Sequence, residues 1–234
     1  MRVRGERECQ SCGTRWSYFE TGKVTCPDCG SQVSVGLSER VEHTDDPVEF
    51  DLSSVRAAIG EAPREEVAEE AAAAARDYCR RSGFVHAGEI DPLSETYLAA
   101  AELREVGVTV ARGFALAEEE ELYYLSLLHG ADRGGRPEPD AVPESVRDDR
   151  GRAVARGVGA YRSDLRRAVE DPEPAVSRTL SSLSAHRKRV DALDGDVPPR
   201  EAEILVAVAR DVGGYLRGED ETALARAGDR LDRL

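Results

Sequence analysis

Four of the five cysteines in this 234-residue chain stand in two short pairs near the amino terminus. The pairs are Cys9-x-x-Cys12 and Cys26-x-x-Cys29, separated by thirteen residues. Two intervening residues let both thiolates of a pair face one side of a tight turn, so two such turns can supply the four corners of a tetrahedron. The spacing therefore predicts a metal site in which these four cysteines bind one structural Zn²⁺.

The residues around the cysteines favour the same interpretation. Gly13 and Gly30 directly follow the two pairs, and glycine tolerates the positive φ that such turns adopt. A segment of about 36 residues buries too little apolar surface to fold alone, whereas a structural zinc supplies about 10–16 kcal/mol. Four thiolates leave no open coordination position, so the predicted site stabilises structure and catalyses no reaction.

The charge of the chain is strongly negative. There are 46 acidic against 32 basic residues, for a net charge of −14, and Lys23 and Lys188 are the only lysines. An acidic, lysine-poor composition resembles that of proteins from salt-loving archaea. This composition accounts for the charge as a means of staying soluble, and it does not require a basic partner.

Nothing in the sequence indicates a membrane or secretory protein. The longest apolar run covers residues 204–209, far below the roughly 18 residues that a membrane-spanning helix needs. The chain begins with charged residues, where a signal peptide needs an apolar stretch. We therefore expect a cytoplasmic protein, in which paired cysteines bind metal more often than they form disulfides.

The pattern of hydrophobic residues divides the chain into three parts. Residues 1–36 show short alternating runs that predict strands, and residues 37–50 are acidic and aperiodic, as in a linker. Residues 51–234 follow a helical period. The predicted fold is mainly α: a small N-terminal β zinc ribbon followed by an all-α bundle of about six or seven helices.

Particular helices can be placed within the bundle. We expect one from Pro63 to Arg81 and another that starts at Asp91-Pro92. A helix from Ala117 is expected to turn Leu122, Leu125 and Leu128 inward, and residues 130–143 read as a loop. Three further amphipathic helices are expected between residues 154 and 216, and a short one near the end of the chain.

The cysteine motifs also carry a resemblance. Cys9-Gln-Ser-Cys12-Gly13 with Cys26-Pro-Asp-Cys29-Gly30 is similar to the zinc ribbon that opens the archaeal general transcription factor B. With its acidic composition, the chain resembles uncharacterised haloarchaeal proteins that carry a ribbon of this type. The resemblance implies a ribbon fold and zinc over residues 1–36. It does not extend to the helical part, which lacks two matching cyclin-like repeats.

The predicted ribbon has features that nucleic acid could use, but they are weak. It holds five basic and four acidic residues, far from a concentrated basic surface. Trp16 and Tyr18 could stack on bases, yet so small a domain needs its aromatic residues for packing over the metal. We therefore favour a protein partner over nucleic acid, and we expect Trp16 and Tyr18 to be core residues.

The helical part lacks the common catalytic motifs. None of the four histidines belongs to a His-Glu-x-x-His or Glu-x-x-His motif, and there is no phosphate-binding loop or Gly-x-Ser-x-Gly sequence. Cys79 is expected to be a small buried residue, and His43 is not needed as a ligand beside four cysteines.

The leading hypothesis is a non-enzymatic zinc-binding interaction module, in transcription or in another information-processing complex. Two alternatives stay open. One is a rubredoxin-like protein that transfers electrons through a single iron. The other is an enzyme with an unrecognised site, which would show a deep pocket in the bundle lined by converging acidic and arginine side chains.

Overall fold

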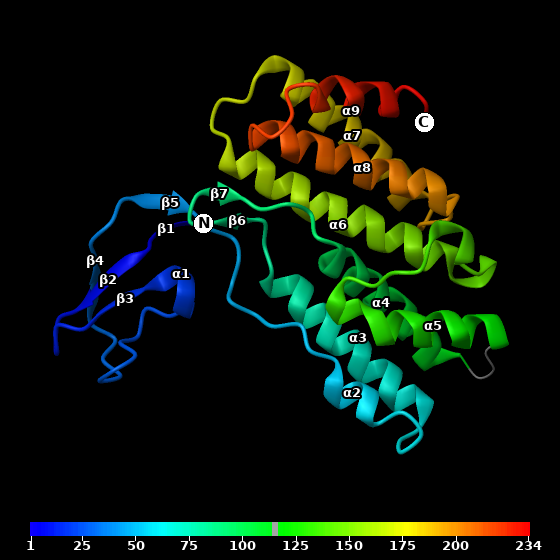
Figure 1. The fold of residues 1–234 in the computed structure, drawn as a ribbon, viewed down its shortest axis with the longest axis horizontal. Helices are drawn as coiled ribbons and strands as arrows, with labels where there is room; N and C mark the ends of the chain where they lie inside the picture. The colour runs from blue at the N-terminus through cyan, green and yellow to red at the C-terminus, as the bar shows by residue number, and fades with distance from the viewer. Residues whose placement is uncertain (114–116) are drawn as a thin grey trace.

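The computed structural model describes residues 1–113 and 117–234, and it places a small β region beside a larger helical body (Figure 1). This arrangement confirms the predicted fold class. In the described residues the strands are β1 (Arg2–Arg4), β2 (Glu6–Cys9), β3 (Arg15–Ser17), β4 (Ser34–Gly36), β5 (Arg40–Glu42), β6 (Val85–His86) and β7 (Glu89–Ile90). The helices are α1 (Tyr18–Thr21), α2 (Ser53–Ala57), α3 (Arg64–Arg81), α4 (Glu95–Arg112), α5 (Glu118–Gly130), α6 (Arg147–Ala168), α7 (Pro174–Ala192), α8 (Pro199–Leu216) and α9 (Ala223–Leu231).

The N-terminal strands form two small antiparallel sheets. In the three-stranded sheet the order is β3-β2-β4, so β4 is an edge strand, and β1 pairs with β5 in a separate ladder. The strand expected around Trp16 and Tyr18 ends at Ser17, where α1 begins. β5 lies inside the segment 37–50 that was expected to be a linker, so this segment contributes to the sheet structure.

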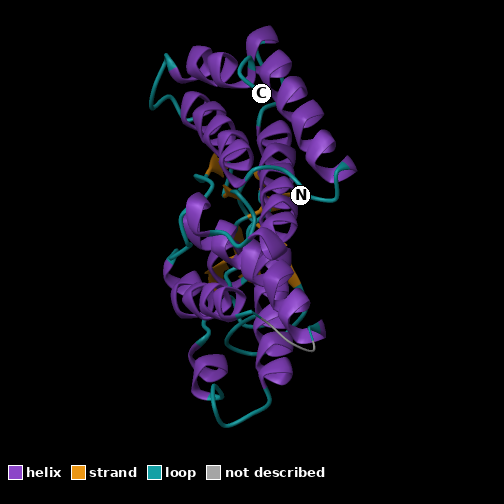
Figure 2. Cartoon of the chain, turned by 90° about the vertical axis from the view of Figure 1, so that its right-hand side faces the viewer, coloured by secondary structure: helices purple, strands orange, loops and turns teal. Residues whose placement is uncertain are grey.

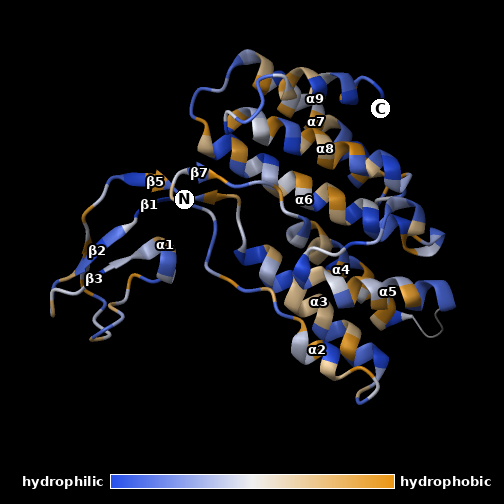
Figure 3. Ribbon diagram, in the orientation of Figure 1, coloured by the Kyte–Doolittle hydropathy of each residue, from blue (hydrophilic) through white to orange (hydrophobic). Residues whose placement is uncertain are grey.

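The helical body has two hydrophobic cores that share α4. One core lies among α2, α3, α4 and α5, and the other among α4, α6, α7, α8 and α9. Ten of the residues of α4 are buried, because the helix is covered on most of its circumference. In side view the helices form an elongated stack (Figure 2), and hydrophobic residues recur along the helices (Figure 3).

Helix α3 packs closely along α4 through small residues. Ala68, Ala71, Ala72 and Ala75 are buried at helical spacing, so the alanine block of the sequence is the inward face of α3. Opposite them, a Cβ on Gly107 would lie 3.0 Å from the carbonyl oxygen of Ala68. Small side chains on both helices are therefore what permits this close approach.

Two helices differ from the sequence-based expectation. Helix α4 begins at Glu95, after Asp91-Pro92, because the Ser94 hydroxyl caps it by accepting the backbone N–H of Tyr97 at 3.1 Å. Helix α5 turns a different face inward: Leu122 is 60% exposed, whereas Tyr123, Tyr124, Leu127 and Leu128 are buried.

The segment 130–143, predicted to be a loop, contains the 3₁₀ turns η1 (Ala131–Arg133) and η2 (Pro139–Ala141); a third, η3 (Glu144–Val146), leads into α6. No helix in the described ranges is long and apolar enough to cross a membrane.

Candidate metal centre

The two cysteine pairs adopt the same backbone turn. The N–H of Cys9 donates to the carbonyl of Thr14 at 2.9 Å, and that of Cys26 donates to Ser31 at 2.9 Å. Within each turn a glycine closes the loop: Gly13 donates to the Cys9 carbonyl at 3.0 Å and Gly30 to the Cys26 carbonyl at 3.1 Å. Their φ angles of +76° and +71° lie in the left-handed region, as the sequence predicted for both glycines.

The four predicted ligands meet at one point. All four Sγ atoms lie within 4.8 Å of one another, and the Cys9–Cys29 and Cys12–Cys26 pairs are 3.6 Å apart. A tetrahedral ion with bonds of about 2.3 Å to sulfur needs sulfur atoms about 3.8 Å apart, whereas a disulfide needs about 2.05 Å. The arrangement fits a shared metal ion. It does not fit two disulfides.

The electrostatics of the site also favour a cation. The backbone N–H groups of Cys12 and Ser11 lower the pKa of Cys9 to about 6, and the hydroxyl of Thr14 lowers the pKa of Cys12. For Cys29 the N–H of Ser31 acts in the same direction, but the crowded sulfurs of Cys12 and Cys9 raise its pKa to about 12. Four thiolates at this spacing repel one another, and a divalent cation at their centre offsets that repulsion.

Trp16 covers the cysteines from one side. It is 7% exposed and forms a small apolar cluster with Cys9 and Cys26, and its indole N–H donates to the carbonyl of Lys23 at 3.0 Å. The prediction that Trp16 packs over the site is confirmed. Tyr18 is also buried, but its ring contacts His43 and Phe19, away from the cysteines.

His43 belongs to the junction between the ribbon and the helical body. It is buried, its Nδ1 accepts the backbone N–H of Ala87 at 3.2 Å, and burial lowers its pKa. Next to it, the Thr44 hydroxyl donates to Asp164 of α6 at 2.6 Å. These bonds tie the end of β5 to the β6–β7 hairpin and to α6, so His43 serves packing and is not part of the cysteine cluster.

The helical body contains a polar cluster that the sequence analysis missed. Glu102 of α4 is 0% exposed and Arg150 of α6 is 1% exposed, and they pair at 3.0 Å. Arg150 also pairs with Glu203 at 2.9 Å, and Arg136 pairs with Glu203 at 2.7 Å. The Tyr123 hydroxyl donates to Glu102. We refer to these five residues as the buried ion network.

The ion network is balanced in charge. Two carboxylates face two guanidinium groups, and Glu102 lies 3.7 Å from Arg136 as well. Burial raises the pKa of Glu102, and the guanidinium groups of Arg150 and Arg136 act against this rise. One sequence signal could have found the network: Glu102 occupies a position in α4 that is one helical turn from Leu98 and Val106, both buried.

Comparison with known proteins identifies the family of the chain but no activity. No curated protein and no solved structure matches the chain. One family model matches residues 1–231, which is nearly the whole chain, and its description is a family of unknown function (DUF7117). The cysteine centre and the helical body are therefore both parts of one family unit, and the chain belongs to family DUF7117.

Proposed function

We propose that residues 1–36 hold one structural Zn²⁺ and that the protein is a non-enzymatic interaction module whose zinc ribbon binds a protein partner. The observation that carries the proposal is the set of four cysteine sulfurs at tetrahedral spacing. Zinc is the usual occupant of such four-thiolate sites, and it has no open position there for a substrate. Its role is to stabilise a surface.

That surface contains several exposed aliphatic residues. Eight large hydrophobic side chains are exposed in the described residues, and four of them lie between residues 24 and 37. Val33, Val35 and Leu37, which we call the aliphatic edge, alternate along the edge strand β4 and the residues that flank it, and they are 62%, 43% and 47% exposed. Figure 3 shows hydrophobic segments in this part of the ribbon, away from the helices. Clustered exposed aliphatic groups favour a protein partner.

The arginines at the start of the chain do not form a free basic surface. Arg2 pairs with Glu170, and Arg4 donates to the carbonyl of Ser38 at 2.8 Å. Trp16 is buried and offers little ring surface for stacking on bases. These contacts favour protein over nucleic acid. The resemblance to the transcription factor B ribbon favours a partner in transcription or in another information-processing complex of the cytoplasm.

Metal analysis of the purified chain tests the zinc site. We expect one zinc per chain, the stoichiometry that four ligands imply. Cys26→Ser should lose the metal and keep its helical circular dichroism, because the two helical cores are built from residues 50 onward. Cys79→Ser, a change in α3, should keep the metal. Substantially less than one metal ion per chain contradicts the proposal, and a red protein with one iron supports the rubredoxin-like alternative instead.

Affinity purification from the native host tests the interaction surface. The bait carries Val33→Glu and Val35→Glu, which place charge on the aliphatic edge without touching a cysteine. Leu122→Glu on α5 is the control, because Leu122 is 60% exposed, close to the 62% of Val33, but lies in the helical body. We expect the edge variant to lose protein partners that the control retains. Identical partner lists for the two variants contradict the proposed surface.

The alternative of an enzyme is favoured by one observation. A hollow of about 430 Å³ next to the buried ion network is lined by Glu95, Arg136, Arg150 and Glu203, among others. This is a combination of acidic and arginine side chains of the kind an active site uses. However, both carboxylates of the network are paired with arginines, which favours a structural role.

A further inference from the structure

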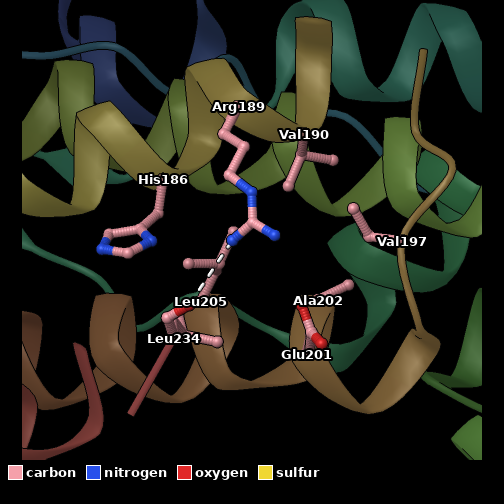
Figure 4. A pocket seen from close by; sticks show the side chains of 8 residues that line it. All are labelled: His186, Arg189, Val190, Val197, Glu201, Ala202, Leu205 and Leu234. Carbon is pink, nitrogen blue, oxygen red and sulfur yellow. Dashed lines mark hydrogen bonds between the residues drawn. The ribbon is translucent and has the colours of Figure 1, made fainter. Parts of the chain in front are cut away.

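The helical body contains hollows of very different size. The hollow between α7, α8 and the C-terminal Leu234 has a volume of only about 20 Å³, close to the space of one water molecule (Figure 4). In it, Arg189 donates to the carbonyl of Leu234 at 3.4 Å. This hollow is too small for a ligand.

A larger pocket lies where α3, α4, α6 and α7 meet. Its volume is about 500 Å³, within the range of about 300–1,000 Å³ that is typical of small-molecule sites. The residues that line it come from all four helices and include Arg80, Arg104, Arg156, Arg162 and Arg187. We call it the arginine pocket, because five of these residues are arginines and none carries a carboxylate.

The charge of the pocket is opposite in sign to the net charge of the whole protein. In a chain with a net charge of −14, five guanidinium groups converge on one cavity. Three carboxylates pair with four of them from outside the lining: Asp77 with Arg80, Glu105 with Arg104 and Arg156, and Asp191 with Arg187. Five positive charges against three negative charges leave an excess of two.

Arg162 is the arginine of the pocket without a carboxylate partner among the described residues. Its Nε donates to the carbonyl of Leu180 at 2.7 Å, which fixes the direction of the side chain. Burial lowers its pKa, and so do the nearby guanidinium groups of Arg166 and Arg187. These groups repel one another, and an anion bound between them removes that repulsion.

Glycines in α6 shape the floor of the pocket. A Cβ on Gly159 would lie 3.2 Å from Cδ of Arg187, so the missing side chain lets Arg187 lie against α6. Cys79 also faces the pocket, but burial raises its pKa to about 12, so the thiol stays protonated. The lining residues include no carboxylate or imidazole to act as a general base.

We propose that the arginine pocket binds a small organic phosphate, with Arg162 and Arg187 holding the phosphate groups. Guanidinium groups match phosphate oxygens in geometry and donate two hydrogen bonds to them. The excess of two positive charges suits a phosphate or diphosphate group. The volume left over, beside Tyr97, Ala101 and Ala155, accommodates an organic portion. A volume in the small-molecule range favours a small molecule over a nucleic-acid strand.

Isothermal titration calorimetry of the full chain with pyrophosphate, ADP and citrate tests the site. We expect saturable binding of pyrophosphate and ADP with one site per chain, and weaker binding of citrate, an anion of similar charge without phosphate. Arg162→Gln combined with Arg187→Gln should weaken binding of both phosphates about a hundredfold or more, since each lost charged hydrogen bond weakens binding about tenfold or more.

The controls keep the outcome specific to the pocket. Arg178→Gln on α7, an exposed arginine outside the pocket, should leave the affinities unchanged. If the double variant does not fold, Arg156→Gln provides a milder change at an exposed position of the lining. Absence of saturable binding by pyrophosphate and ADP overturns the proposal, and so does equal weakening by the pocket and control variants. Tighter binding of a single-stranded RNA than of ADP overturns the small-molecule assignment.

Discussion

Replacement of Arg150 by methionine should destabilise the helical body severely. Arg150 is 1% exposed and pairs with Glu102 at 3.0 Å and with Glu203 at 2.9 Å. Its guanidinium also donates to the carbonyl of Pro137 at 2.9 Å. Without it, the fully buried Glu102 keeps Arg136, at 3.7 Å, as its one nearby cation among the described residues. Removing one partner of a buried ion pair costs about 3–5 kcal/mol, and we expect a loss of this size.

The same argument predicts how the loss of stability in Arg150→Met depends on pH. A carboxyl whose pKa is higher in the folded than in the unfolded protein binds its proton more tightly when folded, so the folded state loses relative stability as the pH rises. Burial already raises the pKa of Glu102 above its ordinary value of 4.5, and Arg150 opposes that rise. Without Arg150 the pKa rises further. The cost of Arg150→Met should therefore be smaller at about pH 5 than at about pH 8.

Urea unfolding followed by circular dichroism measures these free energies. Combining Arg150→Met with Glu102→Met removes both buried charges, so the double variant should be more stable than the sum of the single losses predicts. Arg147→Met, on the same helix, is the control: Arg147 pairs with the exposed Asp196, and such a surface pair contributes at most about 1 kcal/mol. A loss below about 1 kcal/mol for Arg150→Met, or strict additivity in the double variant, refutes a structural role for the network.

Three further changes test other contacts. Trp16→Ala should lower the free energy of unfolding of the ribbon by about 3–5 kcal/mol, because the indole packs against two of the cysteines. The same change should speed the transfer of metal to a chelator, and an unchanged rate of metal release contradicts this expectation. Gly213→Ala should destabilise α8 by about 1–3 kcal/mol, since a Cβ there would lie 1.9 Å from the Tyr161 hydroxyl. Gly214→Ala should be neutral or stabilising in thermal unfolding, because a Cβ there would lie 3.5 Å from its nearest neighbour, the Glu219 carboxylate; the reverse order of stabilities refutes the packing argument. Asp211→Asn should loosen α9, because this buried carboxylate accepts from two arginines of that helix; unchanged hydrogen exchange in α9 contradicts the expectation.

The four-cysteine site was predictable from the sequence because its determinants are local. Each Cys-x-x-Cys turn is defined by five consecutive residues, and Gly13 and Gly30 provide the left-handed backbone that each turn needs. The helical period likewise predicted α3 and the three long helices α6, α7 and α8, since each carries a continuous apolar face. The structure of these turns and helices is determined by residues that are close to one another in the sequence.

The sequence by itself therefore determined a four-cysteine site joined to a helical body. Only the tertiary structure decided which charged residues are buried and which converge. Glu102, Arg136, Arg150 and Glu203 come from four different segments, so the partners of each charge cannot be read from its own segment. The arginine pocket likewise draws its lining from α3, α4, α6 and α7. The physical reason is that an ion pair or a pocket depends on contacts between distant segments, which the local periodicity of any one segment does not encode.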